Sequence, residues 1–134
     1  MTDDAGRVAE DAVRVLLVED DEAVAEMYRL KLELDGYTVE VAIDGESAVQ
    51  RAQADPPDLV FLDLRLPGMD GMAVLQALRA NAGTSATPVV ILSNYSEQEL
   101  IDRGLRLGAL EYLVKSQTTP ARVASGVPGW LGRE

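Results

Sequence analysis

Five short apolar runs that alternate with segments of helical spacing constrain the fold of this 134-residue chain more than any other feature. The runs are rich in valine, leucine and isoleucine, which is typical of strands buried on both faces of a sheet. After them, apolar residues recur every three or four positions, as they do along one side of a helix. The five runs cover residues 13–18, 37–43, 59–62, 89–92 and 109–114.

The repeated order of strand then helix predicts an α/β fold. Consecutive parallel strands cannot be joined by a tight turn and need a crossover, which a helix supplies. We therefore expect a five-stranded parallel sheet with helices on both faces. The length predicts one domain, residues 13–134, preceded by a flexible acidic N-terminal tail over residues 1–12.

The starts of several helices carry recognisable signals. Asp44, Asp70 and Thr119 each precede a helical segment and are suited to an N-cap position. Ser96 and Glu99 have the spacing of a capping box. We therefore expect the fourth helix to begin with that box.

The last helix, from about residue 119, is the least regular. Val123, Val127 and Trp130 keep helical spacing, but Gly126 and Pro128 interrupt it. A proline inside a helix costs about 3 kcal/mol or more. We therefore expect this helix to be shortened or broken.

The composition excludes several classes of site and partner. The chain has no cysteine and no histidine, which excludes disulfides, thiolate zinc sites and histidine-based catalysis. The formal net charge of −11 argues against binding to nucleic acid, which needs a basic surface. No apolar run approaches the roughly 20 residues of a membrane span, and no signal peptide is visible. We therefore expect a cytoplasmic protein that binds neither nucleic acid nor membranes.

Polar and ionisable side chains stand directly after four of the five apolar runs. Glu19 and Asp20 follow the first run, Asp63 the third, Ser93 the fourth and Lys115 the fifth. The carboxyl ends of parallel strands meet at one edge of the sheet, where doubly wound folds place their sites. Taken alone, each of these residues could equally be a helix cap, a turn residue or a residue at a strand edge. The combination at one edge of the sheet favours a functional site.

The predicted cluster has a clear electrostatic consequence. Two carboxylates about 4 Å apart repel by roughly 4 kcal/mol at an effective dielectric constant of 20. A divalent cation with oxygen ligands, together with Lys115, would relieve this repulsion. A carboxylate held against such a cation and an ammonium group is suited to attack phosphorus and form an aspartyl phosphate.

The segments VRVLLVEDD, LVFLDLRLPGMDG, VVILS and EYLVK resemble the receiver domain of bacterial two-component response regulators, of the stand-alone type seen in chemotaxis regulators. The resemblance spans residues 13–119 and involves four separate matches in the right order, each at a strand end. It implies a flavodoxin-like, doubly wound sheet with the strand order 2-1-3-4-5. It also implies that the chain is a signalling phosphoprotein of a two-component phosphorelay.

The resemblance assigns roles to individual residues. Asp63 matches the phosphoacceptor, and Asp20 and Asp63 match Mg²⁺ ligands. The backbone carbonyl of Arg65 matches a third ligand, and Glu19 matches an acidic-pocket position that acts on the ion through water.

The remaining matches concern the response to phosphorylation. Lys115 matches the lysine that contacts the phosphoryl group, and Ser93 matches the hydroxyl that hydrogen-bonds it. Tyr112 matches an aromatic switch that turns inward, although an ordinary half-buried strand tyrosine is the alternative. Arg65 and Tyr95 occupy positions that tune the lifetime of the phosphoryl group in the family.

The implied partners are a histidine kinase or histidine phosphotransfer protein as donor and an unidentified downstream protein. The implied catalysis is limited to the domain's own phosphorylation and dephosphorylation. One alternative is a receiver-fold interaction module that works without phosphorylation. A second is a haloacid dehalogenase-type phosphohydrolase, which wants a second aspartate where this chain has Arg65. We favour a stand-alone receiver because the sequence starts at Met1, and a piece of a longer protein is the alternative.

The sequence departs from the family pattern directly after Lys115. Most receivers have a proline at the next position, in a cis peptide bond, whereas here Lys115 is followed by Ser116. A cis bond before a residue other than proline costs about 2.5–4 kcal/mol. We therefore expect a trans or a strained bond between Lys115 and Ser116.

Overall fold

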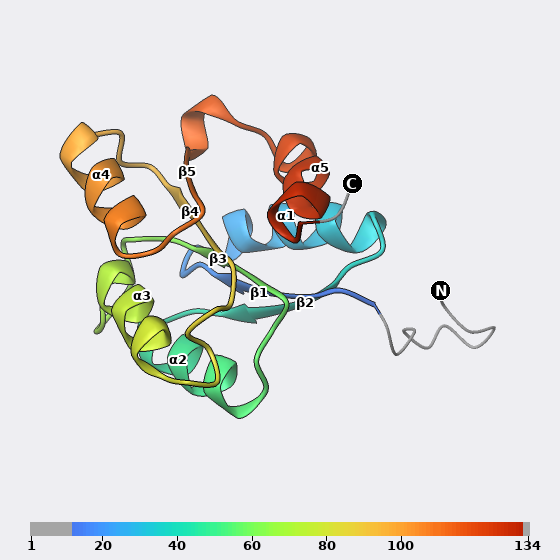
Figure 1. Cartoon of the computed structure of the whole chain (residues 1–134). Coiled ribbons are helices and arrows are strands. Elements are labelled where there is room, and N and C mark those ends of the chain that lie inside the picture. The colour runs from blue at the N-terminus through green and yellow to red at the C-terminus, as the bar shows by residue number, and fades with distance from the viewer. Residues whose placement is uncertain (1–11, 133–134) are drawn as a thin grey trace.

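The sheet has five parallel strands in the order β2-β1-β3-β4-β5, which confirms the predicted topology (Figure 1). The structure is a computed structural model that describes residues 12–132. The predicted acidic tail, apart from Ala12, lies outside the described residues. The strands are β1 (Arg14–Val18), β2 (Thr38–Ala42), β3 (Leu59–Leu62), β4 (Val89–Ser93) and β5 (Glu111–Val114).

Helices cover both faces of the sheet, as predicted. They are α1 (Glu22–Leu34), α2 (Gly45–Ala54), α3 (Gly71–Ala80), α4 (Gln98–Arg106) and α5 (Pro120–Trp130). One core cluster joins the sheet to α1 and α5, and a second joins the opposite face to α2 and α3. Within the described residues, no helix is long and apolar enough to cross a membrane.

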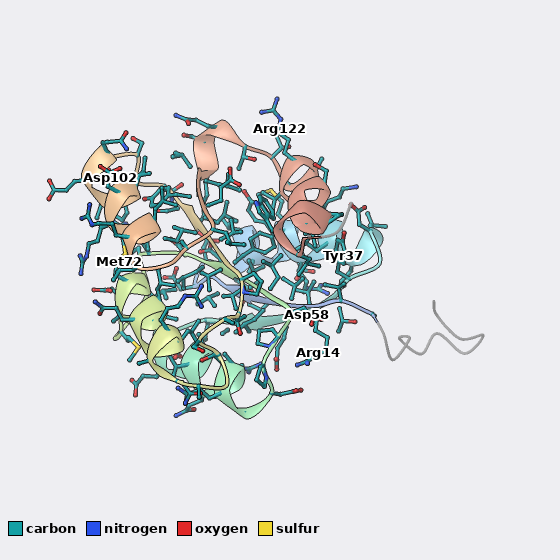
Figure 2. All side chains as sticks on the ribbon, in the orientation of Figure 1. Arg14, Tyr37, Asp58, Met72, Asp102 and Arg122 are labelled. Atoms are coloured by element: carbon teal, nitrogen blue, oxygen red, sulfur yellow. The ribbon has the colours of Figure 1, made fainter. Side chains whose placement is uncertain are left out.

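The central strands explain why short apolar runs suffice to specify the sheet. Every residue of β3 and β4 is buried, because each strand has neighbours on both sides and helices on both faces. The edge strands β2 and β5 are only partly buried. At the amino end of the sheet, the Arg14 backbone N–H donates to Asp58 Oδ2 at 2.8 Å, and both residues are labelled in Figure 2.

Three of the predicted N-caps are confirmed. The side chains of Asp44 and Asp70 each accept a hydrogen bond from a backbone N–H three residues later, at 2.7 and 2.9 Å. Thr119 Oγ1 does the same at 3.1 Å, and Pro120 occupies the first turn of α5. These bonds satisfy N–H groups that a helix leaves unpaired at its start.

The predicted capping box of the fourth helix is wrong. α4 begins at Gln98, and its N-cap residue, Glu97, makes no side-chain cap bond. Ser93 Oγ accepts the Tyr95 backbone N–H at 3.1 Å, and the Glu97 carboxylate accepts the Ser96 N–H at 3.0 Å. The loop therefore turns on these local bonds before helical geometry starts.

The predicted break in the last helix is also wrong, because α5 runs without interruption from Pro120 to Trp130 and includes Pro128. Proline removes one hydrogen bond near the end of the helix, and tertiary packing compensates. Val127 is fully buried, and the Trp130 ring meets the Phe61 ring edge-on, with centroids 5.7 Å apart. The Trp130 indole N–H donates to Glu111 Oε1 at 2.8 Å.

Gly71 allows α3 to start directly against the strand end that carries Asp63. A Cβ atom at position 71 would lie 2.4 Å from the Asp63 carbonyl oxygen and 2.6 Å from Leu64 Cα. Because both contacts are with backbone, Gly71→Ala should lower the free energy of unfolding by about 1–3 kcal/mol, as overpacking does. Urea titration would measure the loss. Gly129→Ala in α5 is the matched control, since its Cβ would have nothing within 4 Å and should leave stability unchanged or raised.

Candidate functional site

The register of the sheet places Glu19 beside Asp63. Val18, the last residue of β1, pairs with Leu62, the last residue of β3. One step further, the Asp63 N–H donates to the Val18 carbonyl at 3.0 Å, and the Glu19 N–H donates to the Ala42 carbonyl at 3.0 Å. The backbone ladder therefore fixes both acidic residues at the carboxyl edge of the sheet.

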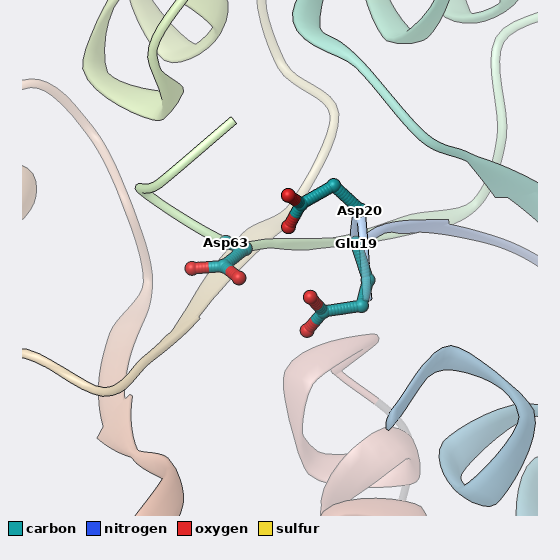
Figure 3. Close-up of side chains that lie close together, drawn as sticks. All are labelled: Glu19, Asp20 and Asp63. Atoms are coloured by element: carbon teal, nitrogen blue, oxygen red, sulfur yellow. The ribbon is translucent and has the colours of Figure 1, made fainter. Parts of the chain in front are cut away.

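Three carboxylates come together at this edge, as Figure 3 shows. Glu19 and Asp20 leave the end of β1 with their carboxylates on the side where Asp63 lies. One oxygen from each lies within 4.8 Å of the others. Glu19 and Asp63 are only 3% and 6% exposed, whereas Asp20 is exposed. Two of the three charges are thus removed from most of the solvent that would screen them.

Lys115 provides the compensating positive charge. Ser93 at the end of β4 pairs with Val114 at the end of β5, so Lys115 emerges at the same edge. Its ammonium donates to Glu19 Oε1 and, at 3.0 Å, to Asp63 Oδ2. The lysine therefore bridges the two buried carboxylates.

The pKa values of Glu19 and Lys115 are set by burial and by the ion pairs. Burial raises the pKa of Glu19, and neither the hydrogen bond from Lys115 nor the one from the Asp21 backbone fully reverses that effect. For Lys115, burial acts to lower the pKa, but the hydrogen bonds to Glu19 and Asp63 outweigh it and the net pKa is raised. The ammonium therefore stays protonated, while Glu19 takes up a proton more readily than an ordinary glutamate.

The acidic cluster opens into a cavity of about 340 Å³. Besides the acidic residues and Lys115, its walls include Arg65, Asn94 and Tyr95. The Arg65 backbone N–H donates to Asp63 Oδ1 at 3.2 Å, which orients the carboxylate. The Arg65 guanidinium donates to the Tyr95 hydroxyl at 3.0 Å and lies 5.6 Å from the centroid of that ring. Asn94 was not among the predicted site residues, although its place directly after the strand-end residue Ser93 was a usable signal.

Ser93 and Tyr112 are not among the residues that line this cavity. Ser93 is fully buried, and its oxygen holds the Tyr95 N–H. Tyr112 is half-buried, and its hydroxyl donates to the Tyr95 carbonyl at 2.8 Å. Both residues are therefore tied to one loop, which forms part of the cavity wall.

The Lys115–Ser116 bond is trans, because no peptide bond within residues 12–132 is cis. Residues Lys115–Gln117 form a single 3-10 turn that leads toward α5. The turn lets a chain with serine rather than proline at position 116 carry the lysine into the pocket and then turn toward the last helix.

The donor atoms of the site suit a hard divalent cation. Carboxylate oxygens are the ligands that Mg²⁺ prefers, and it needs only one or two of them when other oxygens complete its octahedron. Asp20 and Asp63 offer such oxygens to the cavity, with Glu19 beside them. The residues present therefore fit Mg²⁺.

Comparison with known proteins identifies the family. The sequence profile of the response regulator receiver domain matches residues 15–124. The chain belongs to the response regulator receiver domain family. The phosphate regulon transcriptional regulatory protein PhoB of Rhizobium meliloti is 36% identical over 111 residues, which cover 83% of this chain and 49% of that protein. The response regulator MprA of Mycobacterium ulcerans is 40% identical over 104 residues, 78% of this chain and 44% of that protein.

The receiver domain thus spans about half the length of these relatives. Among solved structures, a putative response regulator from Chloroflexus aurantiacus has a TM-score of 0.85 and 32% identity, covering 92% of this chain and 100% of that chain. The receiver domain of the sensor histidine kinase PA1611 from Pseudomonas aeruginosa has a TM-score of 0.82 and 28% identity, covering 90% and 98%. That structure has a magnesium ion coordinated in its active-site cleft.

Proposed function

We propose that this receiver domain accepts a phosphoryl group on Asp63 from a histidine kinase or histidine phosphotransfer protein and signals through protein–protein contact or phosphorelay. The observation that carries the proposal is the bridge from Lys115 to two buried carboxylates at a cavity mouth. A buried acidic cluster destabilises the fold unless cations pair with it. An aspartate beside a fixed cation is suited to react with phosphorus.

The transfer balances with the residues present. A carboxylate oxygen of Asp63 attacks phosphorus, the bond from phosphorus to the donor's imidazole nitrogen breaks, and that nitrogen keeps the electron pair. Lys115 lies 3.0 Å from Asp63 Oδ2 and is placed to contact a phosphoryl oxygen. In this site Asp20 and Asp63, with the Arg65 carbonyl and Glu19 through water, would hold Mg²⁺. The ion supplies charge neutralisation to the phosphoryl oxygens.

Ser93 and Tyr112 would couple the charge of a phosphoryl group on Asp63 to a movement of the loop at Tyr95. Ser93 holds the Tyr95 N–H with its oxygen. Turning the Ser93 hydroxyl proton toward a phosphoryl oxygen would draw the loop toward Asp63. Tyr112 follows that loop because its hydroxyl bonds the Tyr95 carbonyl. We further propose that the domain acts in the cytoplasm and catalyses only its own phosphorylation and dephosphorylation.

Intact-mass measurement with a small acyl phosphate tests the proposal. The protein is incubated with acetyl phosphate in the presence and absence of Mg²⁺. We expect a gain of one phosphoryl group that requires the metal. No gain, with Mg²⁺ binding demonstrated separately, would favour an interaction module that works without phosphorylation.

Asp20→Ala should weaken Mg²⁺ binding by about tenfold or more, as loss of a metal-site residue does. Because Asp20 is the exposed member of the cluster and repels its neighbours, the fold should be as stable as the unaltered protein. Isothermal titration with Mg²⁺ measures the affinity, and urea titration checks the stability. An unchanged Mg²⁺ affinity would remove Asp20 from the metal site.

A further inference from the structure

The loop that follows β4 holds Asn94 at the wall of the acidic cavity. Ser93, the last residue of β4, is fully buried and pairs with Val114 of β5. Its oxygen accepts the Tyr95 backbone N–H at 3.1 Å, and the Tyr112 hydroxyl donates to the Tyr95 carbonyl at 2.8 Å. Asn94 therefore lies between two residues that are both anchored to the sheet.

Asn94 borders the acidic cavity and also a second cavity of about 290 Å³ beside it. Val24 and Lys115 are the other residues that line both. Asn94 is exposed, and within residues 12–132 its amide has no hydrogen-bond partner. The donor hydrogens and the acceptor oxygen of the amide are therefore available to a molecule that binds there.

The other polar residues around the acidic cavity are either charged or already bonded. The acidic ones are Glu19, Asp20, Asp21 and Asp63. Lys115 pairs with two of them, and the Arg65 guanidinium donates to the Tyr95 hydroxyl at 3.0 Å. Among the described residues that line this cavity, Asn94 is therefore the one neutral polar side chain that makes no hydrogen bond.

The hydrolysis of an acyl phosphate on Asp63 is a step that such an amide can assist. Hydrolysis needs a water molecule whose oxygen faces phosphorus. An ammonium group only donates hydrogen bonds and a carboxylate only accepts them, whereas an amide can accept from the attacking water and donate to a phosphoryl oxygen. In GTP-hydrolysing proteins, a glutamine amide orients the attacking water.

We propose that Asn94 is a catalytic residue for hydrolysis of the phosphoryl group, and that its amide orients the attacking water. This inference rests on the proposed phosphorylation of Asp63. The water oxygen attacks phosphorus, the bond between phosphorus and the Asp63 oxygen breaks, and that oxygen keeps the electron pair. The products are the free carboxylate and inorganic phosphate, which carries both protons of the water.

Asn94→Leu is the test variant, because leucine nearly keeps the size of the side chain and removes the amide. The protein is phosphorylated with acetyl phosphate and Mg²⁺, the donor is removed by rapid desalting, and intact mass follows the loss of the phosphoryl group. The group should persist about three- to tenfold longer than on the unaltered protein, the effect expected for one lost hydrogen bond.

Two further measurements on Asn94→Leu separate hydrolysis from other effects. The rate of phosphoryl gain should fall less than the rate of hydrolysis, because Asp63 is the nucleophile in the gain and no water needs to be oriented. Unfolding in urea should be unchanged, because Asn94 is exposed and its side chain makes no hydrogen bond within the described fold.

Asn94→Ala distinguishes orientation of water from shielding. If the amide orients the water, alanine prolongs the lifetime of the phosphoryl group as leucine does. If the side chain only shields the group from solvent, alanine opens the cavity and shortens the lifetime, which would overturn the proposal. Ser96→Ala, exposed in the same loop, is the matched control and should lose the phosphoryl group at the rate of the unaltered protein.

Selective labelling with ¹⁵N-asparagine gives a readout that does not depend on a rate. The chain has two asparagines, Asn81 and Asn94, and Asn94→Leu assigns the signal of the second. Phosphorylation should shift the side-chain amide of Asn94 and leave that of Asn81, which accepts the Gly83 N–H after the end of α3. An unmoved Asn94 amide would overturn its role in hydrolysis.

The unaltered protein in the same series tests the proposed function separately. If it gains no phosphoryl group, the proposed function fails and the role of Asn94 fails with it. If it gains the group and Asn94→Leu loses the group at the same rate, only the role of Asn94 is overturned.

Discussion

Replacing Asp63 by asparagine is expected to abolish Mg²⁺-dependent labelling by acetyl phosphate. An amide oxygen cannot form the acyl phosphate. The amide side chain would also lack the negative charge that would bind the metal and pair with Lys115. The side chain keeps its size, so the N–H of Arg65 and the ammonium of Lys115 retain an acceptor at this position. Intact mass before and after incubation measures the effect, which should be complete.

Asp102→Asn is the matched control for this substitution. Asp102 is exposed on α4, where it accepts a hydrogen bond from Gln98 at 2.9 Å. This variant should label as fully as the unaltered protein. Labelling of the Asp63 variant at normal stoichiometry would show that another side chain is the nucleophile.

The second large effect is expected on stability, from Lys115→Met in a buffer that contains a metal chelator. Methionine keeps the apolar stem but removes the charge that joins two carboxylates with side-chain exposures of 4% and 8%. Removing one partner of a buried ion pair costs about 3–5 kcal/mol, and we expect about 3 kcal/mol, at the lower end of that range, because the remaining charges face a cavity. Urea unfolding at neutral pH measures this loss.

Mg²⁺ and acid should both reduce that loss. Mg²⁺ replaces the missing positive charge and stabilises the folded state by mass action. Burial raises the pKa of Glu19 in the fold above its ordinary value of 4.5, and the hydrogen bond from Lys115 opposes that rise. Lys115→Met removes the opposing bond, so folding of the variant favours the protonated carboxyl more strongly than folding of the unaltered protein does. The free energy of unfolding of the variant therefore increases as the pH falls through the raised pKa of Glu19. It levels off below the ordinary pKa of a glutamate.

Lys31→Met is the control for the loss of a lysine. Lys31 pairs with Asp35 at 2.9 Å on the surface of α1, and exposed pairs of this kind contribute about 0.3–0.5 kcal/mol. A loss for the Lys115 variant no larger than that of this control would mean that the buried carboxylates are not held as charges.

The fold could be predicted from sequence because its signals are local. A strand such as Leu59–Leu62 is buried on both faces, and continuous burial leaves a continuous apolar run. Asp44 and Asp70 cap the helices that follow them through bonds spanning three residues. The two errors arose where other groups decide: Ser93 turns the chain before α4, and the Phe61 ring supports the end of α5 beyond Pro128.

The candidate site was predictable to the extent that its residues follow strands directly. Glu19, Asp63 and Lys115 do so, and the sheet register alone brings them together. Sequence could not show that Ser93 and Tyr112 would be tied to the loop at Tyr95 and would not line the cavity. That arrangement depends on how the loop after β4 packs against β5, which no local pattern specifies.

Because Lys115 bridges Glu19 and Asp63, the site is complete only when folding is complete. The lysine is 96 residues from Glu19 and 52 residues from Asp63 along the chain. Contacts across such distances form late, after the cost in loop entropy has been met. A nascent chain emerging from the ribosome holds its acidic residues long before β5 can dock beside β4. The proposed phosphoryl site therefore lacks Lys115 until the last strand is in place, so immature molecules would be poor competitors for the phosphoryl donor.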